Sequence, residues 1–395
     1  MIIDYKIAGT RIAPGTSSAA IRNTTSAKAN GRITSANTLF SRRLEGKFKS
    51  VPDVTMRKAL YSLFFIAALS GAIAYGYWAQ QRPVAHYLSD LRIEVAINQG
   101  QPSERGNLLG IQPELFPADY QDPTRLRLKL QGYMQEAQAQ GLLNARTIVV
   151  LPEHIGTWLR LTGEKDELYQ ASKDGEADHW LNISNPLKFA WAWLRASGDD
   201  RGADARVRMK ARHMAKAYQA LFGGLAKEFG VTLVAGSIVL PEPYLKGDTL
   251  KVGSGALYNS SLVFGPDGRP LGSPLRQRLP GKYDSRYVQA ADDAGVELLN
   301  TRIGRVGVLI GTDSEQATNL HKLETAGASA IVIPAYADDR IAPRPAITGE
   351  TPVLGVYMHG HFWNRQNRGQ SFIGLHDQTF EAAPGPGARL INLWL

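Results

Sequence analysis

The sequence feature that most constrains this chain is an uncharged, largely apolar run of 23 residues from Ala59 to Gln81. As a helix rising about 1.5 Å per residue, it reaches roughly 34 Å, which exceeds the hydrocarbon core of a bilayer at about 30 Å. The run is apolar on all faces, whereas a surface helix of a globular domain carries a polar stripe. It therefore predicts a transmembrane anchor within residues 56–82. Two alternatives stay open, a signal peptide cleaved at Ala72-Ile73-Ala74 and a buried core helix.

Charge along the chain predicts an orientation for this helix. The net charge is +9, and residues 1–58 carry +8 of it. An excess of Lys and Arg marks the cytoplasmic side of a span, and Tyr75, Tyr77 and Trp78 at the other end suit the membrane interface. The expected location is the inner (cytoplasmic) membrane, single-pass, with the C-terminal domain in the periplasm.

Residues 1–55 are rich in Ser, Thr, Ala, Asn and Gly and show no hydrophobic period, which predicts a disordered basic tail. Met56 would also serve as an ordinary start, so it stays open whether the tail belongs to the mature protein. A basic tail suits nucleic acid, but the rest of the chain is nearly neutral and carries no zinc-finger or RNA-binding signature. We therefore expect the membrane, and no nucleic acid, as a partner.

Residues 88–395 alternate short β-branched runs with segments of helical period, which predicts a layered α/β domain whose site lies at the carboxyl ends of its strands. The segment 161–204 is expected to be a polar, irregular insertion near the site mouth. The predicted strands are 91–97, 147–151, 231–240, 257–264, 305–310 and 330–333, and the predicted helices pass through Leu126 to Ala137, Val207 to Leu225, and Leu320 to Leu323.

The chain contains no cysteine. This excludes disulfides, thiol catalysis, Cys-ligated zinc and iron–sulfur clusters. His359 and His361, with His376 or Asp377, are the remaining candidates for a metal site, but their spacing matches no ligand pattern. We expect no metal and no cofactor.

Seven fragments occur in the order typical of one enzyme family, and between Leu91 and Asp377 the chain resembles the carbon-nitrogen hydrolase family, or nitrilase superfamily. The fragments are LRIEVAINQ, IVVLPEHIGTW, LVAGSIVLPE, YNSSLVFGPDGRPLG, LRQRLPGKYD, VGVLIGTDSE and AGASAIVIPA. The resemblance implies an αββα sandwich, often dimeric, in which Glu, Lys and Cys cleave nonpeptide amide or nitrile bonds through an acyl-enzyme. The RLP segment and the expected placement are also similar to the periplasmic domain of apolipoprotein N-acyltransferases, which have many more membrane spans.

The resemblance assigns three positions of the catalytic triad. Glu153, after the strand and a proline, matches the general base, which takes and returns a proton. Matching the family's Tyr-x-Lys-x-x-Leu pattern through Leu279 puts Arg276 at the position of the lysine that stabilises the oxyanion, with Lys282 as a relocated substitute. The family's Gly-Val-x-Ile-Cys-x-Asp pattern falls on GVLIGTD, so Gly311 stands where the nucleophile is expected.

Three further residues are weaker candidates for the same site. Thr312 and Ser314 carry hydroxyls near the lost thiol, and Thr312 is the weak alternative nucleophile. Asp313 is a candidate binding residue, but the segment 312–314 also suits the N-cap of a helix beginning near Glu315. Glu242 follows a strand as Glu153 does and is expected to line the same mouth.

Three functions remain open from the sequence. The first is a membrane-anchored, periplasm-facing carbon-nitrogen hydrolase domain that has lost cysteine-dependent hydrolysis and keeps a binding or scaffolding role for an amide-like or acyl ligand. The second is an active amidase or N-acyltransferase-like enzyme that uses Glu153 with water or Thr312 and, for the oxyanion, Arg276. The third is a structural dimerising domain, so a homodimer is among the expected assemblies.

Overall fold

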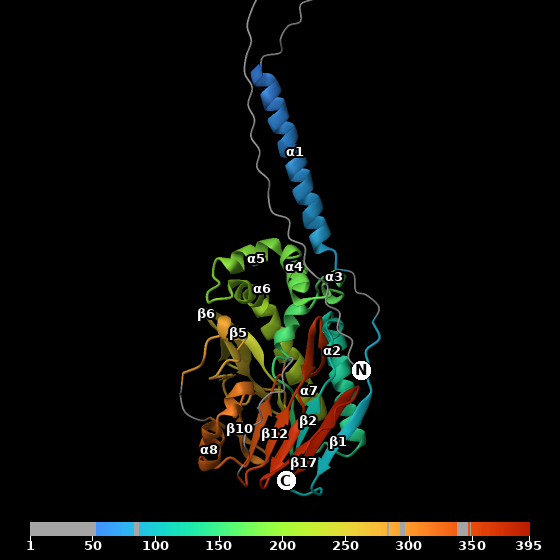
Figure 1. Cartoon of the computed structure of the whole chain (residues 1–395), viewed down its shortest axis with the longest axis vertical. Coiled ribbons are helices and arrows are strands. Elements are labelled where there is room, and N and C mark those ends of the chain that lie inside the picture. The colour runs from blue at the N-terminus through green and yellow to red at the C-terminus, as the bar shows by residue number, and fades with distance from the viewer. Residues whose placement is uncertain (1–52, 83–86, 283, 293–296, 338–346, 348) are drawn as a thin grey trace, which may run out of the picture. The chain divides into compact units, whose positions relative to one another are not determined.

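The computed structural model describes residues 53–82, 87–282, 284–292, 297–337, 347 and 349–395 (Figure 1). The predicted tail, residues 1–55, lies almost wholly outside the described residues. The described residues fall into two units that divide between Phe65 and Ile66. Helix α1 (Asp53–Gln80) covers the predicted anchor, and its segment Val54–Gln80 is long and apolar enough to cross a membrane.

Two six-stranded sheets form the centre of the second unit. The strand order is β1-β17-β2-β3-β4-β7 in the first sheet and β16-β15-β12-β11-β10-β9 in the second. Neighbouring strands β2, β3 and β4 are parallel, as are β10, β11 and β12. The strands are β1 (Ile93–Gln99), β2 (Asn107–Gln112), β3 (Thr147–Val150), β4 (Thr232–Val234), β7 (Val263–Phe264), β9 (Leu298–Thr301), β10 (Gly304–Val308), β11 (Ala330–Pro334), β12 (Val353–Val356), β15 (Phe372–Leu375), β16 (Gln378–Glu381) and β17 (Ala388–Trp394).

The two sheets pack face to face through branched apolar side chains. Ile148 and Val234 from the first sheet share a fully buried core with Val306 and Leu354 from the second. The sheets approach closely at Gly110, where a Cβ atom would lie 2.8 Å from Val356 Cγ2. A central core of this kind explains why the strands are apolar on both faces, since each sheet is also covered by helices on its outer side.

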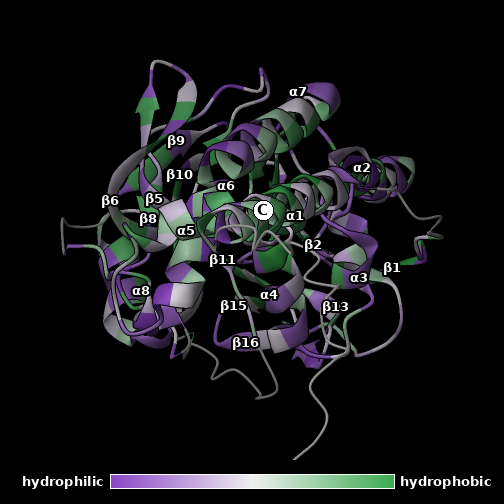
Figure 2. Ribbon diagram, turned by 90° about the horizontal axis from the view of Figure 1, so that it is seen from above, coloured by the Kyte–Doolittle hydropathy of each residue, from purple (hydrophilic) through white to green (hydrophobic). Residues whose placement is uncertain are grey.

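Helices cover the outer face of each sheet, which completes the αββα sandwich that the sequence predicted. In Figure 2, α2 and α7 lie on one side of the molecule and α8 lies on the other. Leu130 and Tyr133 of α2 pack with the first sheet, and Leu320 and Leu323 of α8 pack with the second. The helices are α2 (Pro123–Ala139), α6 (Arg201–Tyr218), α7 (Gly224–Phe229) and α8 (Ala317–Thr325), and a π-helical turn (Gln219–Gly223) joins α6 to α7.

The structure differs from three sequence predictions. The segment 161–204 is helical and forms α3 (Asp166–Tyr169), α4 (Asp174–Ile183), α5 (Pro186–Trp193) and the start of α6. The single strand predicted over 231–240 is two strands, β4 and β5 (Ile238–Lys246), and β5 pairs with β6 (Thr249–Ser261) in a separate sheet that also holds β8 (Leu275–Arg276). The strand predicted over 257–264 is divided between β6 and β7, which belong to different sheets. A hairpin of β13 (His359–Phe362) and β14 (Arg365–Arg368) completes the described strands.

Candidate functional site

A cavity of about 620 Å³ lies where the loop after β3 meets the loop after β10. It is bordered by the start of α6, by the short helix Asp284–Arg286 and by the short helix Gly311–Glu315. Since β3 and β10 belong to different sheets, the cavity sits at the ends of strands from both layers. This is where an α/β layer structure presents its functional loops.

Glu153 projects from the loop after β3 and is buried at this cavity, with 5% of its surface exposed. Its backbone N–H donates to the carbonyl of Ala335, which follows β11. Its Oε1 accepts hydrogen bonds from Asn259 Nδ2 at 2.8 Å and from Gln277 Nε2 at 3.1 Å. Burial raises the pKa of Glu153 to about 7, against the opposing attraction of His154. The carboxyl group therefore exchanges its proton near neutral pH.

Gln277, and not Arg276, lies against Glu153. The Gln277 side chain is 1% exposed, and its Nε2 also lies 3.0 Å from the carbonyl of Ile310. Arg276 points elsewhere: its guanidinium stacks 4.2 Å from the Tyr258 ring centroid and donates to the Pro243 carbonyl. Among the described residues, no Lys or Arg forms an ion pair with Glu153. A neutral amide thus occupies the place beside the carboxyl that the family pattern gives to a cation.

Gly311 opens the short helix after β10 and lies directly beside Glu153. Its φ of +50° belongs to the left-handed region, which glycine adopts without a steric penalty. A Cβ atom built on Gly311 would lie 2.7 Å from the carboxyl carbon of Glu153, closer than carbon atoms approach in folded proteins. The Glu153 carboxyl therefore fills the space that a side chain at position 311 would need.

Thr312 lines the cavity, but its hydroxyl is already engaged. The hydroxyl donates to the carbonyl of Leu279 and lies 3.2 Å from Gln277 Nε2. Its proton is therefore directed at a backbone oxygen instead of a general base, which an alcohol nucleophile requires.

Asp313 has a structural role in the loop that carries Gln277. Its carboxylate accepts from the backbone N–H groups of Arg278 and Leu279, at 3.0 and 2.7 Å. The N-cap of α8 is Gln316, so Asp313 does not cap that helix. Burial raises the pKa of Asp313, and the two N–H donors oppose that rise.

The other two candidates differ in location. Lys282, the possible relocated substitute for the family lysine, lines the cavity. Glu242 is exposed, lies at an irregularity in β5 and accepts a hydrogen bond from the Gly255 backbone N–H, and it is not part of the cavity wall. The two LPE segments therefore differ in place, since Glu153 follows the end of β3 and Glu242 lies within β5.

A second polar group in the cavity, the pair of His154 and Asp284, was not predicted from the sequence. His154 Nε2 lies 2.8 Å from Asp284 Oδ2 and 3.8 Å from Glu153 Oε1, and Tyr287 donates to Asp284 Oδ1. Burial lowers the pKa of His154, but the charge and hydrogen bond of Asp284 and the charge of Glu153 together outweigh burial, so the net shift is upward. Burial likewise raises the pKa of Asp284, and His154 reverses this to a net decrease. The sequence signal for this pair was the position of its members beside residues already assigned to the site: His154 follows Glu153, and Asp284 lies two residues after Lys282.

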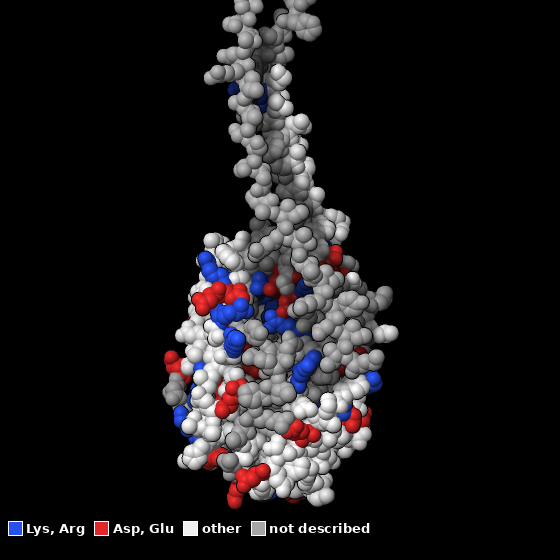
Figure 3. Space-filling view, viewed as in Figure 1, with Lys and Arg blue, Asp and Glu red and all other residues white. Residues whose placement is uncertain are grey.

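The wall of the cavity carries charges of both signs. Asp178 pairs with Arg206 at 3.0 Å, and Asp174 pairs with Arg365. Figure 3 shows Lys, Arg, Asp and Glu gathered together on the part of the surface that α4, α5 and α6 occupy, while fewer charges mark the opposite end. Among the described residues, no group of three or more His, Asp or Glu side chains is arranged to hold a metal ion. His359 of β13 lies 3.6 Å from Glu114, away from the cavity wall.

Comparison with known proteins identifies the family. The model of the carbon-nitrogen hydrolase family matches residues 95–374. No curated protein matches the chain. Similar solved structures include a cysteine-to-serine variant of a nitrilase-superfamily amidase from Nesterenkonia AN1, at 15% identity, 73% of this chain, 92% of that chain and a TM-score of 0.48. Another is a variant of the same amidase with the acetamide moiety of fluoroacetamide added at its active-site cysteine, at 15% identity, 75% and 93% coverage and a TM-score of 0.47. Because the family model spans well over half of the sequence, the chain belongs to the carbon-nitrogen hydrolase family.

Proposed function

We propose that this protein is a membrane-anchored, periplasm-facing carbon-nitrogen hydrolase domain that binds a polar, amide-bearing ligand without forming an acyl-enzyme. The observation that carries the proposal is the packing of Glu153 against Gly311. The carboxyl group fills the space of the missing nucleophile, and Gln277 replaces the cation that would stabilise an oxyanion. The pocket remains open while two of the three triad functions are absent.

The chemistry of the pocket supports an amide-bearing ligand. A carboxyl group that titrates near pH 7 can donate a hydrogen bond when protonated and accept one when ionised, so it suits both ends of an amide. The Asp178–Arg206 pair and Lys282 add fixed charges of both signs to the wall. A ligand with an amino and a carboxylate group in addition to the amide would complement this wall better than an uncharged amide of the same size.

The contacts of Thr312 disfavour the alternative of an active acyltransferase. Its hydroxyl donates to Leu279, and Gln277 lies between the Thr312 and Glu153 oxygens as a donor to each. Attack by water activated by Glu153 would also leave the developing oxyanion without a lysine or arginine partner beside Glu153. Among the described residues, neither route therefore has a lysine or arginine paired with Glu153, where the family pattern expects the cation.

The proposal is tested with the full-length protein in detergent. Glutamine, asparagine and propionamide are titrated calorimetrically, and ammonia release is followed in parallel. We expect saturable binding of glutamine or asparagine, weaker binding of propionamide, and no ammonia above a protein-free blank. The variant Glu153→Gln should change the pH dependence of binding, and Gln378→Ala, on an exposed edge strand, serves as the matched control. Ammonia release that Glu153→Gln abolishes would overturn the proposal.

The membrane placement is part of the same proposal. It is supported by the length and composition of α1 and by Arg57 and Lys58 at its N-terminal end. A periplasm-dependent reporter, alkaline phosphatase, fused after Leu395 should be active in whole cells, and the same reporter fused before Asp53 should be inactive. The reverse pattern would contradict the orientation.

A further inference from the structure

Helix α5 presents an apolar face that the body of the protein leaves uncovered. Leu187, Trp191 and Leu194 are 85%, 60% and 72% exposed. Their spacing of four and then three residues places them on one side of a helix. The opposite side of the same segment is buried, since Ala192 and Ala196 pack with the α6 residues around Ala205. Helix α5 is therefore apolar on two sides, and only one side serves the protein core.

The beginning of α5 lies where α1 ends. The Tyr75 hydroxyl of α1 donates to the carbonyl of Ile183, and the Trp78 ring lies 6.4 Å from the ring of Trp180. Ile183 is the last residue of α4, and α5 begins three residues later at Pro186. The uncovered face thus belongs to the helix that directly follows the contact between α1 and α4.

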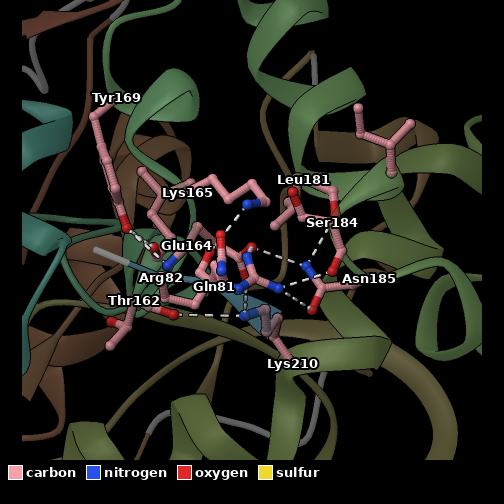
Figure 4. A network of polar contacts seen from close by, with 12 residues as sticks. Gln81, Arg82, Thr162, Glu164, Lys165, Tyr169, Leu181, Ser184, Asn185 and Lys210 are labelled. Atoms are coloured by element: carbon pink, nitrogen blue, oxygen red, sulfur yellow. Dashed lines mark hydrogen bonds and ion pairs between the residues drawn. The ribbon is translucent and has the colours of Figure 1, made fainter. Parts of the chain in front are cut away.

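A buried ionic network fixes this junction. Glu164, whose side chain is 1% exposed, accepts from Arg82, which follows α1, and from Lys210 of α6. Arg82 also donates to the Ser184 carbonyl at 2.8 Å, and Asn185 Nδ2 donates to Glu164 at 2.9 Å. Figure 4 shows these side chains converging on the Glu164 carboxylate.

Lys165 adds a second link at the same place. Its Nζ donates to the carbonyl of Gln81 at 3.0 Å and lies 4.2 Å from the ring of Trp78. Since Ser184 and Asn185 lead directly into Pro186, the exit of α1 and the start of α5 are held by one set of hydrogen bonds.

The chemistry of the exposed face matches a lipid surface. Exposed Leu and Trp are accompanied by Lys188 and Arg195, and the Arg195 guanidinium lies 4.4 Å from the Trp191 ring. Leucine and tryptophan flanked by basic residues favour the boundary between headgroups and acyl chains, and the cations suit anionic headgroups. Arg195 can contact phosphate while its stem covers the indole.

We propose that the outward face of α5 inserts into the interface of the bilayer that α1 crosses, in the leaflet at the C-terminal end of α1. This inference rests on the proposed anchoring by α1. Helix α6, on which α5 packs, also supplies Ala203 and Arg206 to the cavity wall, so lipid contact of α5 holds the ligand cavity close to the membrane surface.

The experiment uses the full chain, which contains no native cysteine, in nanodiscs of mixed anionic and zwitterionic lipid with one copy per disc. Single cysteines, Leu194→Cys, Ile73→Cys and Gln378→Cys, are labelled with an environment-sensitive NBD fluorophore. All three positions are exposed, so the substitutions leave the core intact. Quenching by lipids with a nitroxide at a shallow or a deep position of the acyl chain then reports depth.

We expect a blue-shifted emission at position 194 with stronger quenching by the shallow nitroxide, a deep signal at position 73, and a water-like, unquenched signal at position 378. A deep label at 73 with a water-like label at 194 would overturn the inference and leave the anchor standing. A water-like label at 73 would overturn both. A label at 194 that is protected only in discs with two copies would assign the face to a second chain and overturn the lipid contact.

Discussion

Two buried glutamates in this molecule have opposite kinds of partners. Glu164, at the junction of α1 with the body, meets two cations, Arg82 and Lys210. Glu153, at the cavity, accepts hydrogen bonds from two neutral amides, and among the described residues its one ion-pair contact is with His154 at 3.8 Å. A buried carboxylate that is paired with cations links the elements that carry them. A buried carboxyl group that is hydrogen-bonded only to amides has a raised pKa and can change its charge near neutral pH. The difference marks the junction as structural and the cavity as the chemical site.

The largest expected effect follows from removing the charge at the junction. Glu164→Gln leaves Arg82 and Lys210 without their shared partner, and burial already lowers the pKa of Lys210 against the pull of Glu164. We expect the free energy of unfolding to fall by about 3 kcal/mol, as for other buried pairs that lose one member. Urea denaturation of the detergent-solubilised protein measures it.

The matched control for that experiment is Glu228→Gln, which removes the partner of Arg127 in an ion pair whose two side chains are 36% and 31% exposed. Exposed pairs contribute about 0–1 kcal/mol. If the two variants lose the same free energy of unfolding, the ionic network at the junction is no more stabilising than an exposed ion pair, which would contradict the comparison.

The next largest effect is the pH dependence of stability from Glu153. Its folded pKa is raised from 4.5 to about 7, so the folded state binds more protons than the unfolded state between these values. The stability contribution of the protonated group is therefore present below pH 4.5 and is lost as the pH rises through 7, by up to about 3 kcal/mol. The variant Glu153→Gln keeps the neutral form and should show a flatter profile between pH 5 and 8. Identical profiles would contradict the assigned environment of Glu153.

Placing a cysteine at position 311 should lower the free energy of unfolding and should not produce a thiol that reacts rapidly. In Gly311→Cys, the side chain meets the Glu153 carboxyl, and the positive φ disfavours a residue with a Cβ. We expect a loss of about 1–3 kcal/mol and a decrease in melting temperature. Fluoroacetamide labelling, in which the thiolate displaces fluoride to form a C–S bond, is read by intact-mass spectrometry. It should be slow, because the Glu153 carboxyl lies beside position 311 and its neighbour Gln277 is neutral, so no lysine beside Glu153 favours the thiolate. Rapid labelling at wild-type stability would show that the cavity is a complete site lacking only sulfur.

The smallest expected effect is that of Thr312→Val. The change removes the hydrogen bond to Leu279, which is worth about 1 kcal/mol, and leaves ligand binding unchanged. Calorimetric titration and thermal unfolding check the two parts. A loss of hydrolytic activity in this variant would identify Thr312 as the nucleophile and contradict the contrast drawn between cavity and junction.

The sequence predicted the fold well because the strands and long helices carry strong periods. The αββα sandwich was implied by the resemblance to the carbon-nitrogen hydrolase family, and the strands through Thr147 and Ala330, and α2 and α8, were expected from these periods. The segment 161–204 was not, since α5 is apolar on both sides and α4 is short, so neither shows a clear helical stripe. A helix with apolar residues on both sides lacks the amphipathic pattern from which surface helices are predicted.

At the site, the sequence could not predict which residue of the β8 segment faces Glu153. Glu153 and Gly311 were expected to lie together and do, because each directly follows a strand of a different sheet. Arg276 was matched to the lysine position, but β8 contains only Leu275 and Arg276, and neighbouring side chains in extended chain point in opposite directions. A shift of one residue therefore exchanged Arg276 for Gln277 at the carboxyl group. The sequence could not show which of the two side chains faces Glu153, because the alternation of buried and exposed residues along a strand is recognisable only in strands longer than the two residues of β8.

In the part of the chain that the structure describes, the Glu153 carboxyl has no lysine or arginine partner, fills the space of a missing nucleophile and is expected to titrate near neutral pH. Nuclear magnetic resonance of protein labelled with ¹³C at the glutamate side-chain carboxyl tests it most directly, with Glu153→Gln used to assign the resonance. The account predicts a carboxyl resonance, absent from that variant, with a titration midpoint of about 7. A midpoint near 4.5, the value of an ordinary glutamate, would contradict it.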